Sequence, residues 1–155
     1  MGGRLNRESR SSGKRILWVD INPSNRSELY GFIARAAQLG DVTGCTIAEA
    51  RHADEGIALL EKAEAGNAPF DLVITHWGHR GAKDGAGRKI PVAERLLREV
   101  RAHDLCVALL IFAGPMDVAE HKKKAFGLGA QGYYYTYGGI LRGIERVFTL
   151  EEETV

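Results

Sequence analysis

The sequence of 155 residues has only two cysteines, Cys45 and Cys106. Both lie in runs of apolar or small residues, which indicates reduced core thiols in a cytosolic protein rather than a disulfide. The net charge of +1 at pH 7 gives no bulk attraction for nucleic acid. No apolar run reaches the roughly 18 residues that a membrane-spanning helix needs. The small net charge argues against a nucleic-acid partner, and the lack of a long apolar run argues against a membrane partner. Together with the two reduced cysteines, these features favour a soluble cytoplasmic protein.

One domain of ordinary composition accounts for most of the chain. The 45% hydrophobic and 26% charged residues are typical of a globular protein with a single core. Residues 1–13 are basic and lack the apolar centre of a signal peptide, so we expect a flexible tail there. We expect the domain over 14–150, followed by a frayed acidic end, EEETV, over 151–155.

Apolar stretches with strand character alternate with segments of helical periodicity along the whole domain. We expect strands over 15–20, 45–50, 71–77, 106–113 and within 129–137, and helices over 22–39, 53–66, 90–103, 118–128 and 140–148. Such alternation predicts an α/β fold, in which a parallel sheet carries helices on both faces.

The carboxyl ends of the strands are where ligands bind in a fold of this class. The residues at or just after the ends of four of the predicted strands are Asp20, Ile21, His76, Trp77, Phe112, Ala113, Thr136 and Tyr137. We therefore expect any functional pocket to be built from this set.

Four phrases of the sequence carry a resemblance to a known family. They are ILWVDINP, FDLVITHW, LLREVRAH and AFGLGAQGYYYTY, in this order, and the small residues around Ala130 and Gly132 are the most telling. Together they resemble the receiver domain of bacterial two-component response regulators over about residues 14–150. The resemblance implies a flavodoxin-like, receiver-like fold: a five-stranded parallel sheet of order 2-1-3-4-5 with helices on both faces.

Receiver chemistry transfers a phosphoryl group to an aspartate, with a magnesium ion held by an acidic pair and with a hydroxyl and a lysine on the phosphoryl oxygens. Carried over by position, the acidic pair falls on Asp20 and Ile21, the nucleophile on His76, the hydroxyl on Phe112 and the lysine on Thr136. The proline after the lysine falls on Tyr137, and only the switch aromatic, at Tyr133, matches. The resemblance therefore implies a pseudo-receiver: a signalling module that is not an enzyme and needs no cofactor.

Two other interpretations of the pocket remain open. Asp20 and His76 can form a site for a small ligand, a metal or a phosphate, with the histidine as a general base near neutral pH. His76 and His79 also form an H-x-x-H pair, but we favour a neutral His76 at the pocket floor, a solvated His79 and no metal, because zinc needs further ligands. In the other interpretation, Asp20 or Asp84 replaces the missing nucleophile of a regulator in a phosphorelay.

Two surface segments are candidates for contacts. The segment from Gly78 to Lys89 is long for a connection in an α/β protein and is either a solvated insertion or a docking loop for an anion or an acidic partner. Its cationic and histidine residues are His79, Arg80, Lys83, Arg88 and Lys89. The basic run HKKK at 121–124 reads as a solvated helix face.

The tyrosine-rich stretch YYYTY forms the second candidate surface. Strand alternation places Tyr133 and Tyr135 on one face and Tyr134 and Thr136 on the other, and Tyr137 follows. In receivers, the surface around the last strand is the usual partner-binding face, and tyrosines are enriched at interfaces. We therefore expect contacts with another protein, either a sensor kinase or a second copy of the chain.

Overall fold

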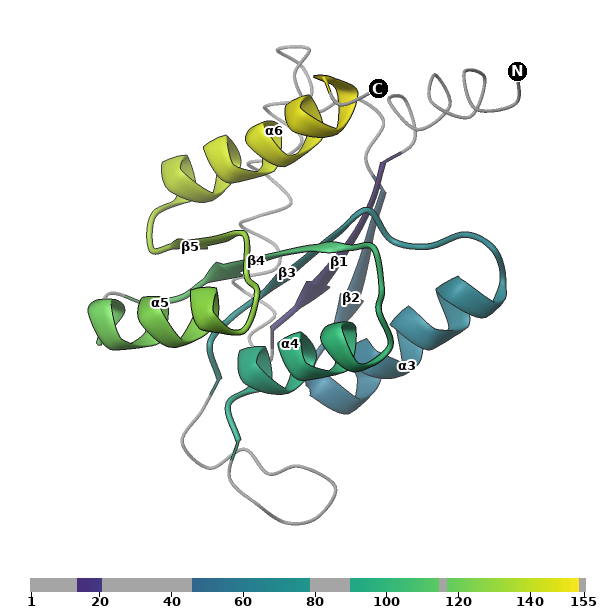
Figure 1. Cartoon of the computed structure of the whole chain (residues 1–155), viewed down its shortest axis with the longest axis horizontal. Coiled ribbons are helices and arrows are strands. Elements are labelled where there is room, and N and C mark those ends of the chain that lie inside the picture. Colours follow the sequence, from purple (N-terminus) through teal and green to yellow (C-terminus); the bar gives the residue numbers. More distant parts are fainter. Residues whose placement is uncertain (1–13, 21–45, 79–89, 115–116, 154–155) are drawn as a thin grey trace.

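A five-stranded parallel sheet runs through the centre of the computed structural model, which describes residues 14–20, 46–78, 90–114 and 117–153 (Figure 1). The strands are β1 (Arg15–Val19), β2 (Thr46–Ala50), β3 (Leu72–Thr75), β4 (Ala108–Phe112) and β5 (Gly132–Tyr134). Their order is β2-β1-β3-β4-β5, and each pairs with its neighbours in parallel. The fold predicted from the sequence is confirmed.

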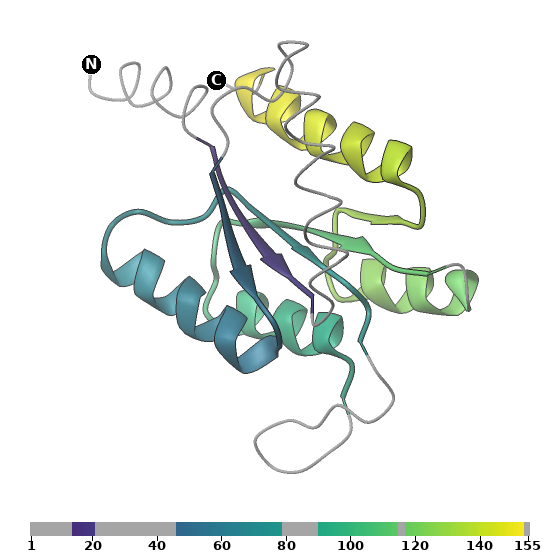
Figure 2. The same ribbon diagram turned by 180° about the vertical axis from the view of Figure 1, so that it is seen from behind.

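Helices cover both faces of this sheet. They are α3 (Ala53–Ala65), α4 (Val92–Ala102), α5 (Val118–Gly127) and α6 (Tyr137–Glu153). Figures 1 and 2 show α3, α4 and α5 on one side and α6 on the other. The helix predicted over 22–39 lies outside the described residues, and none of the described helices is long and apolar enough to cross a membrane.

The core has two layers, one on each side of the sheet. Along β1, Leu17 and Val19 face the layer under α3 and α4, whereas Ile16 and Trp18 face the layer under α6. All four side chains are fully buried. A strand buried on both faces is a continuous apolar run, and this is why β1 was recognisable in the sequence.

Several boundaries differ from the prediction, and three of these differences change where a named residue lies. The third strand ends at Thr75, so His76 and Trp77 follow the strand instead of completing it. The last helix begins at Tyr137, because Thr136 accepts a hydrogen bond from Gly139 N at 3.0 Å and provides a helix cap ahead of two glycines. The prediction of a core thiol at Cys106 is wrong: β4 begins at Ala108, and Cys106 is exposed in the preceding link. Cys45 lies outside the described residues.

Candidate functional site

A cavity of about 270 Å³ opens at the carboxyl ends of the strands. Its lining residues are Asp20, His76, Phe112, Ala113, Gly114, Tyr135, Thr136 and Tyr137. The structure thus brings together most of the strand-end residues singled out in the sequence. Ile21 lies outside the described residues, and Trp77 is not part of the lining.

Backbone hydrogen bonds hold the pocket residues in place beyond the last strand residues. Asp20 N donates to Ala50 O at 2.9 Å, and His76 N donates to Val19 O at 3.2 Å. Ala113 N donates to Tyr134 O at 2.9 Å. The sheet pairing therefore continues to the rim of the cavity, and the pocket rests on rigid elements.

Asp20 and His76 form the polar part of the pocket. The Asp20 side chain is only 3% exposed, and His76 is half-buried. The Thr75 hydroxyl donates to His76 O at 2.9 Å, which helps to fix the backbone at the end of β3. Among the residues that the structure describes, Asp20 is the one acidic residue of the lining, and no lysine or arginine contributes to it.

Aromatic rings form one wall. The ring centroids of Phe112 and Tyr137 lie 5.0 Å apart at an interplanar angle of 54°. Phe112 also contacts Trp18, at 6.2 Å between ring centroids. Phe112 therefore contacts two other aromatic rings, and it is the residue on which the resemblance to receivers places a hydroxyl.

Thr136 is the residue on which the resemblance to receivers places their lysine. Its hydroxyl oxygen accepts the hydrogen bond from Gly139 N, so the side chain caps the first turn of α6. A threonine brings no positive charge to the cavity. No lysine or arginine is among the described residues that line the cavity.

Trp77 points away from this cavity into the core and organises a second aromatic group. Its ring stacks on the imidazole of His121 in α5, at 4.5 Å between centroids and 14° between planes. His121 Nδ1 lies 3.3 Å from the hydroxyl of Tyr133, within hydrogen-bonding distance. Burial, and then the negative charge of Asp117, raise the pKa of Tyr133 above its ordinary value.

The basic run of α5 is therefore not simply a solvated face, as the sequence suggested. His121 is half-buried against Trp77. Lys124 Nζ lies 2.7 Å from Glu94 Oε1, and Glu94 is buried in the first turn of α4. Trp77 and Glu94 are both distant in sequence from α5. The HKKK run alone therefore gave no indication that His121 and Lys124 contact them.

The tyrosines separate into buried and exposed residues. Tyr133 is only 4% exposed, and its ring packs in the core beside Trp77, so it is not presented to a partner. Because β5 ends at Tyr134, the alternation predicted as far as Thr136 stops there. Tyr135 is 55% exposed, and Phe126 of α5 is 46% exposed. The sequence reading included Tyr135 but missed Phe126.

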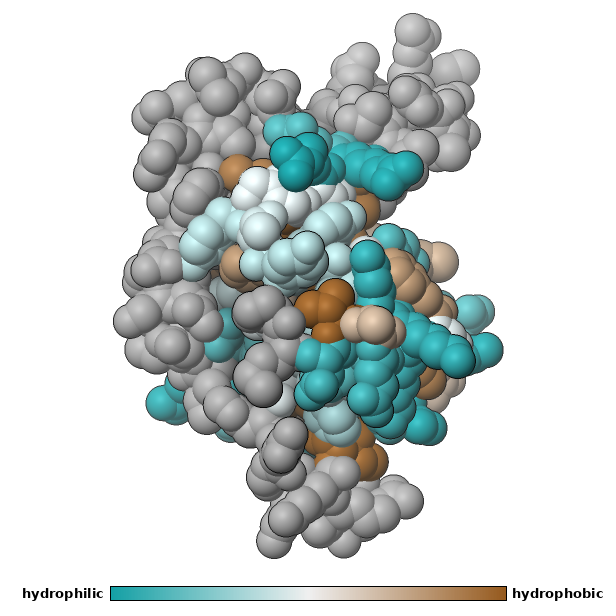
Figure 3. All heavy atoms as spheres, turned by 90° about the vertical axis from the view of Figure 1, so that its left-hand side faces the viewer, coloured by the Kyte–Doolittle hydropathy of each residue, from teal (hydrophilic) through white to brown (hydrophobic). Residues whose placement is uncertain are grey.

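One side of the molecule is seen in Figure 3, with its described residues coloured by hydropathy. Hydrophilic and weakly polar residues cover most of the described part of this face, and a small apolar patch lies between them. Isolated apolar residues on a polar surface are ordinary, whereas exposed aromatic rings are enriched where proteins bind one another.

The predicted loop residues His79, Arg80, Lys83, Arg88 and Lys89 lie outside the described residues. Among the residues that are described, the one group of three candidate metal ligands is Glu61, Glu99 and His103, which lies between α3 and α4 and not at the strand ends. Glu99 and His103 pair with each other at 2.8 Å on one face of α4.

Solved structures show which fold this is. A response regulator receiver domain protein from Clostridium thermocellum is 18% identical, with a TM-score of 0.64 over 92% of this chain and 99% of the other. The signal receiver domain of an HD domain-containing protein from Pseudomonas fluorescens Pf-5 is 18% identical, with a TM-score of 0.66 over 91% and 98%. A LuxR family DNA-binding response regulator from Silicibacter pomeroyi is 16% identical, with a TM-score of 0.60 over 88% and 92%.

At these identities the likeness defines the fold, which is that of receiver domains. No family model matches the sequence. No curated protein matches it either.

Proposed function

We propose that this chain is a receiver-like signalling module that acts through protein contacts and has lost phosphorylation on aspartate. The observation that carries the proposal is the content of the strand-end cavity. Asp20 stands there with His76, Phe112 and Thr136, so the cavity lining offers one carboxylate, an imidazole, a phenyl ring and a capping hydroxyl. These groups supply neither the aspartate nucleophile nor the lysine on which an acyl phosphate depends.

The receiver fold supports a signalling role, because the neighbouring structures include response regulators. We place the contact surface on α5, β5 and the start of α6, where Phe126 and Tyr135 expose large parts of their rings. The partner is a sensor kinase or another regulatory protein, or a second copy of the chain. The chain then acts by binding its partner through that surface and not by enzymatic turnover. We place this protein in the cytoplasm.

A second candidate function keeps the same cavity as a small-ligand site. The cavity of about 270 Å³ is close in size to the smaller ligand pockets of proteins, roughly 300 Å³. Its buried carboxylate at Asp20, with no lysine or arginine among the described lining residues, favours a cation over a phosphate. A thermal-shift titration with Mg²⁺ and with inorganic phosphate separates these two ligand classes.

Acetyl phosphate tests the main proposal. We expect the intact mass of the full chain to remain unchanged after incubation with acetyl phosphate and Mg²⁺, while a phosphorylatable receiver domain in the same assay gains one phosphoryl group. A stoichiometric adduct that hydroxylamine removes would overturn the proposal, because it would show an acyl phosphate. Peptide mapping of that adduct to Asp20 or Asp84 would favour the phosphorelay interpretation instead.

A further inference from the structure

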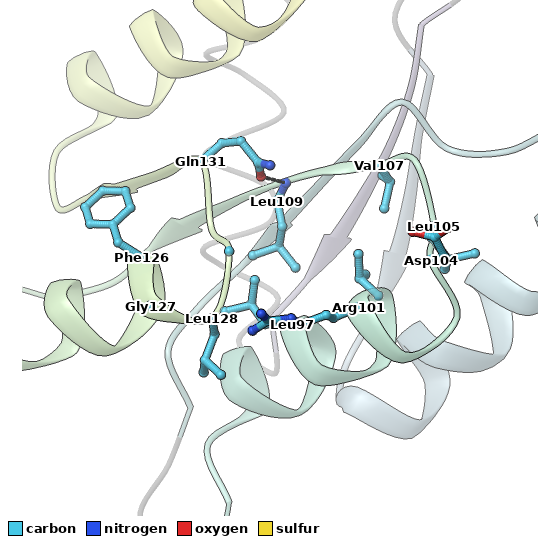
Figure 4. A pocket seen from close by; sticks show the side chains of 12 residues that line it. Leu97, Arg101, Asp104, Leu105, Val107, Leu109, Phe126, Gly127, Leu128 and Gln131 are labelled. Carbon is cyan, nitrogen blue, oxygen red and sulfur yellow. Dashed lines mark hydrogen bonds between the residues drawn. The ribbon is translucent and has the colours of Figure 1, made fainter.

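A second cavity, of about 340 Å³, opens at the opposite edge of the sheet from the strand-end cavity (Figure 4). It lies between the C-terminal half of α4, the link that leads into β4 and the link that leads from α5 into β5. Its apolar lining residues include Leu97, Val100, Leu105, Val107, Leu109 and Leu128. No residue lines both cavities.

Hydrogen bonds fix the walls of this cavity. Leu105 N donates to Val100 O at 3.0 Å, which ties the link before β4 to the end of α4. Leu109 N donates to the side-chain oxygen of Gln131 at 2.7 Å, and Gln131 N donates to Leu109 O at 2.9 Å. The cavity is therefore formed before any ligand arrives, which lowers the entropic cost of binding.

Arg101 supplies the charge at this cavity. In Figure 4 its side chain runs back along α4 toward Leu97, and Leu97 and Leu128 line the same cavity. Arg101 is part of the lining and forms no ion pair with any residue of the described ranges. The guanidinium is thus an exposed cation at a cavity that also has leucine and valine side chains in its lining.

The other arginines of α4 behave differently. Arg95 pairs with Asp54 of α3, and Arg98 Nη2 lies 3.0 Å from Glu94 Oε2. Their charges are already balanced inside the protein. Arg101 is thus the arginine of α4 that has no ion-pair partner among the described residues, and it lies at the cavity.

We propose that this cavity binds a small amphipathic carboxylic acid. The apolar body of the acid packs against the leucines of the lining, and its carboxylate accepts hydrogen bonds from the Arg101 guanidinium, which matches a carboxylate with two parallel donors. Asp104 is also among the lining residues, and tighter binding of octylammonium than of octanoate would show that its carboxylate selects a cation instead.

The size of the cavity favours a small molecule over a protein segment. About 340 Å³ falls in the range of roughly 300–1,000 Å³ that small-molecule sites occupy. At ~30 Å³ per water-sized group, the space suits a ring or a medium-length chain of about ten such groups. A protein partner needs an interface of about 1,000 Å² or more, which a pocket of this size does not provide on its own.

Octanoate is the probe for this site, with acetate, 1-octanol and octylammonium as comparisons. Amide chemical shifts of the uniformly ¹⁵N-labelled full chain report where each binds. We expect octanoate to move the signals of Leu105, Leu109, Leu128 and Gln131, and acetate to move none of them. Octanol and octylammonium should bind about tenfold more weakly than octanoate, the factor that one charge-assisted contact of ~1.4 kcal/mol contributes.

Arg101→Gln tests the headgroup contact without disturbing the core, because Arg101 is exposed on α4. Octanoate affinity should fall about tenfold in this variant, while octanol affinity stays unchanged. Lys123→Gln removes the same charge from an exposed position outside the cavity and should change neither affinity.

Two further results would overturn the inference. One is octanoate shifts that gather elsewhere or do not occur at millimolar concentration. The other is equal loss of octanoate affinity in the Arg101→Gln and Lys123→Gln variants, which would reveal a general charge effect. Neither result bears on phosphorylation, so the proposed function is tested separately.

Discussion

The ring of Tyr134 lies so close to the backbone of Gly143 that a Cβ at position 143 would meet ring carbons at 2.6 Å. Gly143 belongs to α6 and Tyr134 to β5, so this contact sets how closely the helix approaches the sheet. The same ring would stand 3.3 Å from a Cβ at Gly139, one turn earlier. The ring of Tyr134 thus packs against two glycines that lie four residues apart in α6.

Gly143→Ala should destabilise the protein although alanine is the better helix former. Alanine gains about 1 kcal/mol of helix propensity, whereas inserting a methyl group into a packed contact costs about 1–3 kcal/mol. We expect a net loss of about 1 kcal/mol in the free energy of unfolding, measured by urea denaturation. Tyr134→Ala in the same chain should remove the clash between the ring and the new methyl group. The double variant should therefore lose less free energy of unfolding than the sum of the losses in the two single variants.

Gly127→Ala is the matched control. Gly127 is also helical, and a Cβ there would meet nothing within 4 Å. This substitution should stabilise by up to about 1 kcal/mol. If both glycine variants change stability by the same amount, the ring of Tyr134 does not restrict position 143.

Glu94 and Lys124 connect α4 to α5, and their pairing predicts a pH effect. Burial raises the pKa of Glu94, but the hydrogen bond and charge of Lys124, and then those of Arg98, outweigh it and hold this pKa below the ordinary glutamate value. A pKa lowered by folding stabilises the folded state above the unfolded pKa of about 4.3, and this contribution is lost as the pH falls through the folded value.

Glu94→Gln should therefore cost about 1–2 kcal/mol at pH 7, and less at pH 3, because the stabilisation by the wild-type carboxylate declines once the pH falls below the unfolded pKa. Urea unfolding at the two pH values measures the difference. Arg98→Gln, at a side chain 60% exposed, should cost no more than about 1 kcal/mol. A Glu94→Gln penalty that is the same at both pH values would contradict an ionised Glu94 in the folded protein.

The sequence predicted the sheet well because each buried parallel strand is a short, continuous apolar run. It located Asp20, His76, Phe112 and Thr136 at one pocket for the same reason, since the carboxyl ends of parallel strands share one edge of the sheet. Strand order followed from the resemblance to receivers and not from the composition of any strand.

Long-range side-chain contacts could not be predicted in this way. Nothing local to His121 indicates that it stacks on Trp77, which is 44 positions earlier in the chain (121 − 77 = 44). Glu94 gives no sequence signal for burial, because acidic residues are usually exposed, and its burial depends on ion pairs with Lys124 and Arg98. The cavity beside Arg101 depends on two links that approach each other only in the folded protein.

The contact between Tyr133 and His121 predicts a second, alkaline effect. Tyr133→Phe removes a buried hydroxyl that lies near His121 Nδ1, and it should cost about 1 kcal/mol at pH 7. Folding raises the pKa of Tyr133, so its stabilising contribution is complete below the unfolded pKa of about 10 and declines as the pH rises through the folded value.

The gap between wild type and Tyr133→Phe should accordingly narrow above pH 10, as measured by urea unfolding at pH 7 and pH 10.5. Tyr135→Phe is the control, since its ring is largely exposed and its hydroxyl has no described partner, and it should match wild type at both pH values. A gap that widens with pH would show that ionised Tyr133 is tolerated in the core.

Phe126 and Tyr135 provide the last prediction, which concerns association. Replacing both with serine removes the two most exposed large apolar side chains among the described residues, and neither ring is part of the buried core. The free energy of unfolding should change by less than about 0.5 kcal/mol, while binding through the α5–β5–α6 surface should weaken at least tenfold.

Sedimentation velocity at rising concentration measures binding to a second copy. Capture from a lysate of the source cells measures binding to other proteins. Lys62→Ser, on the exposed side of α3, is the control and should bind like wild type. Association that persists undiminished in the double variant would place the contact surface on another side of the molecule.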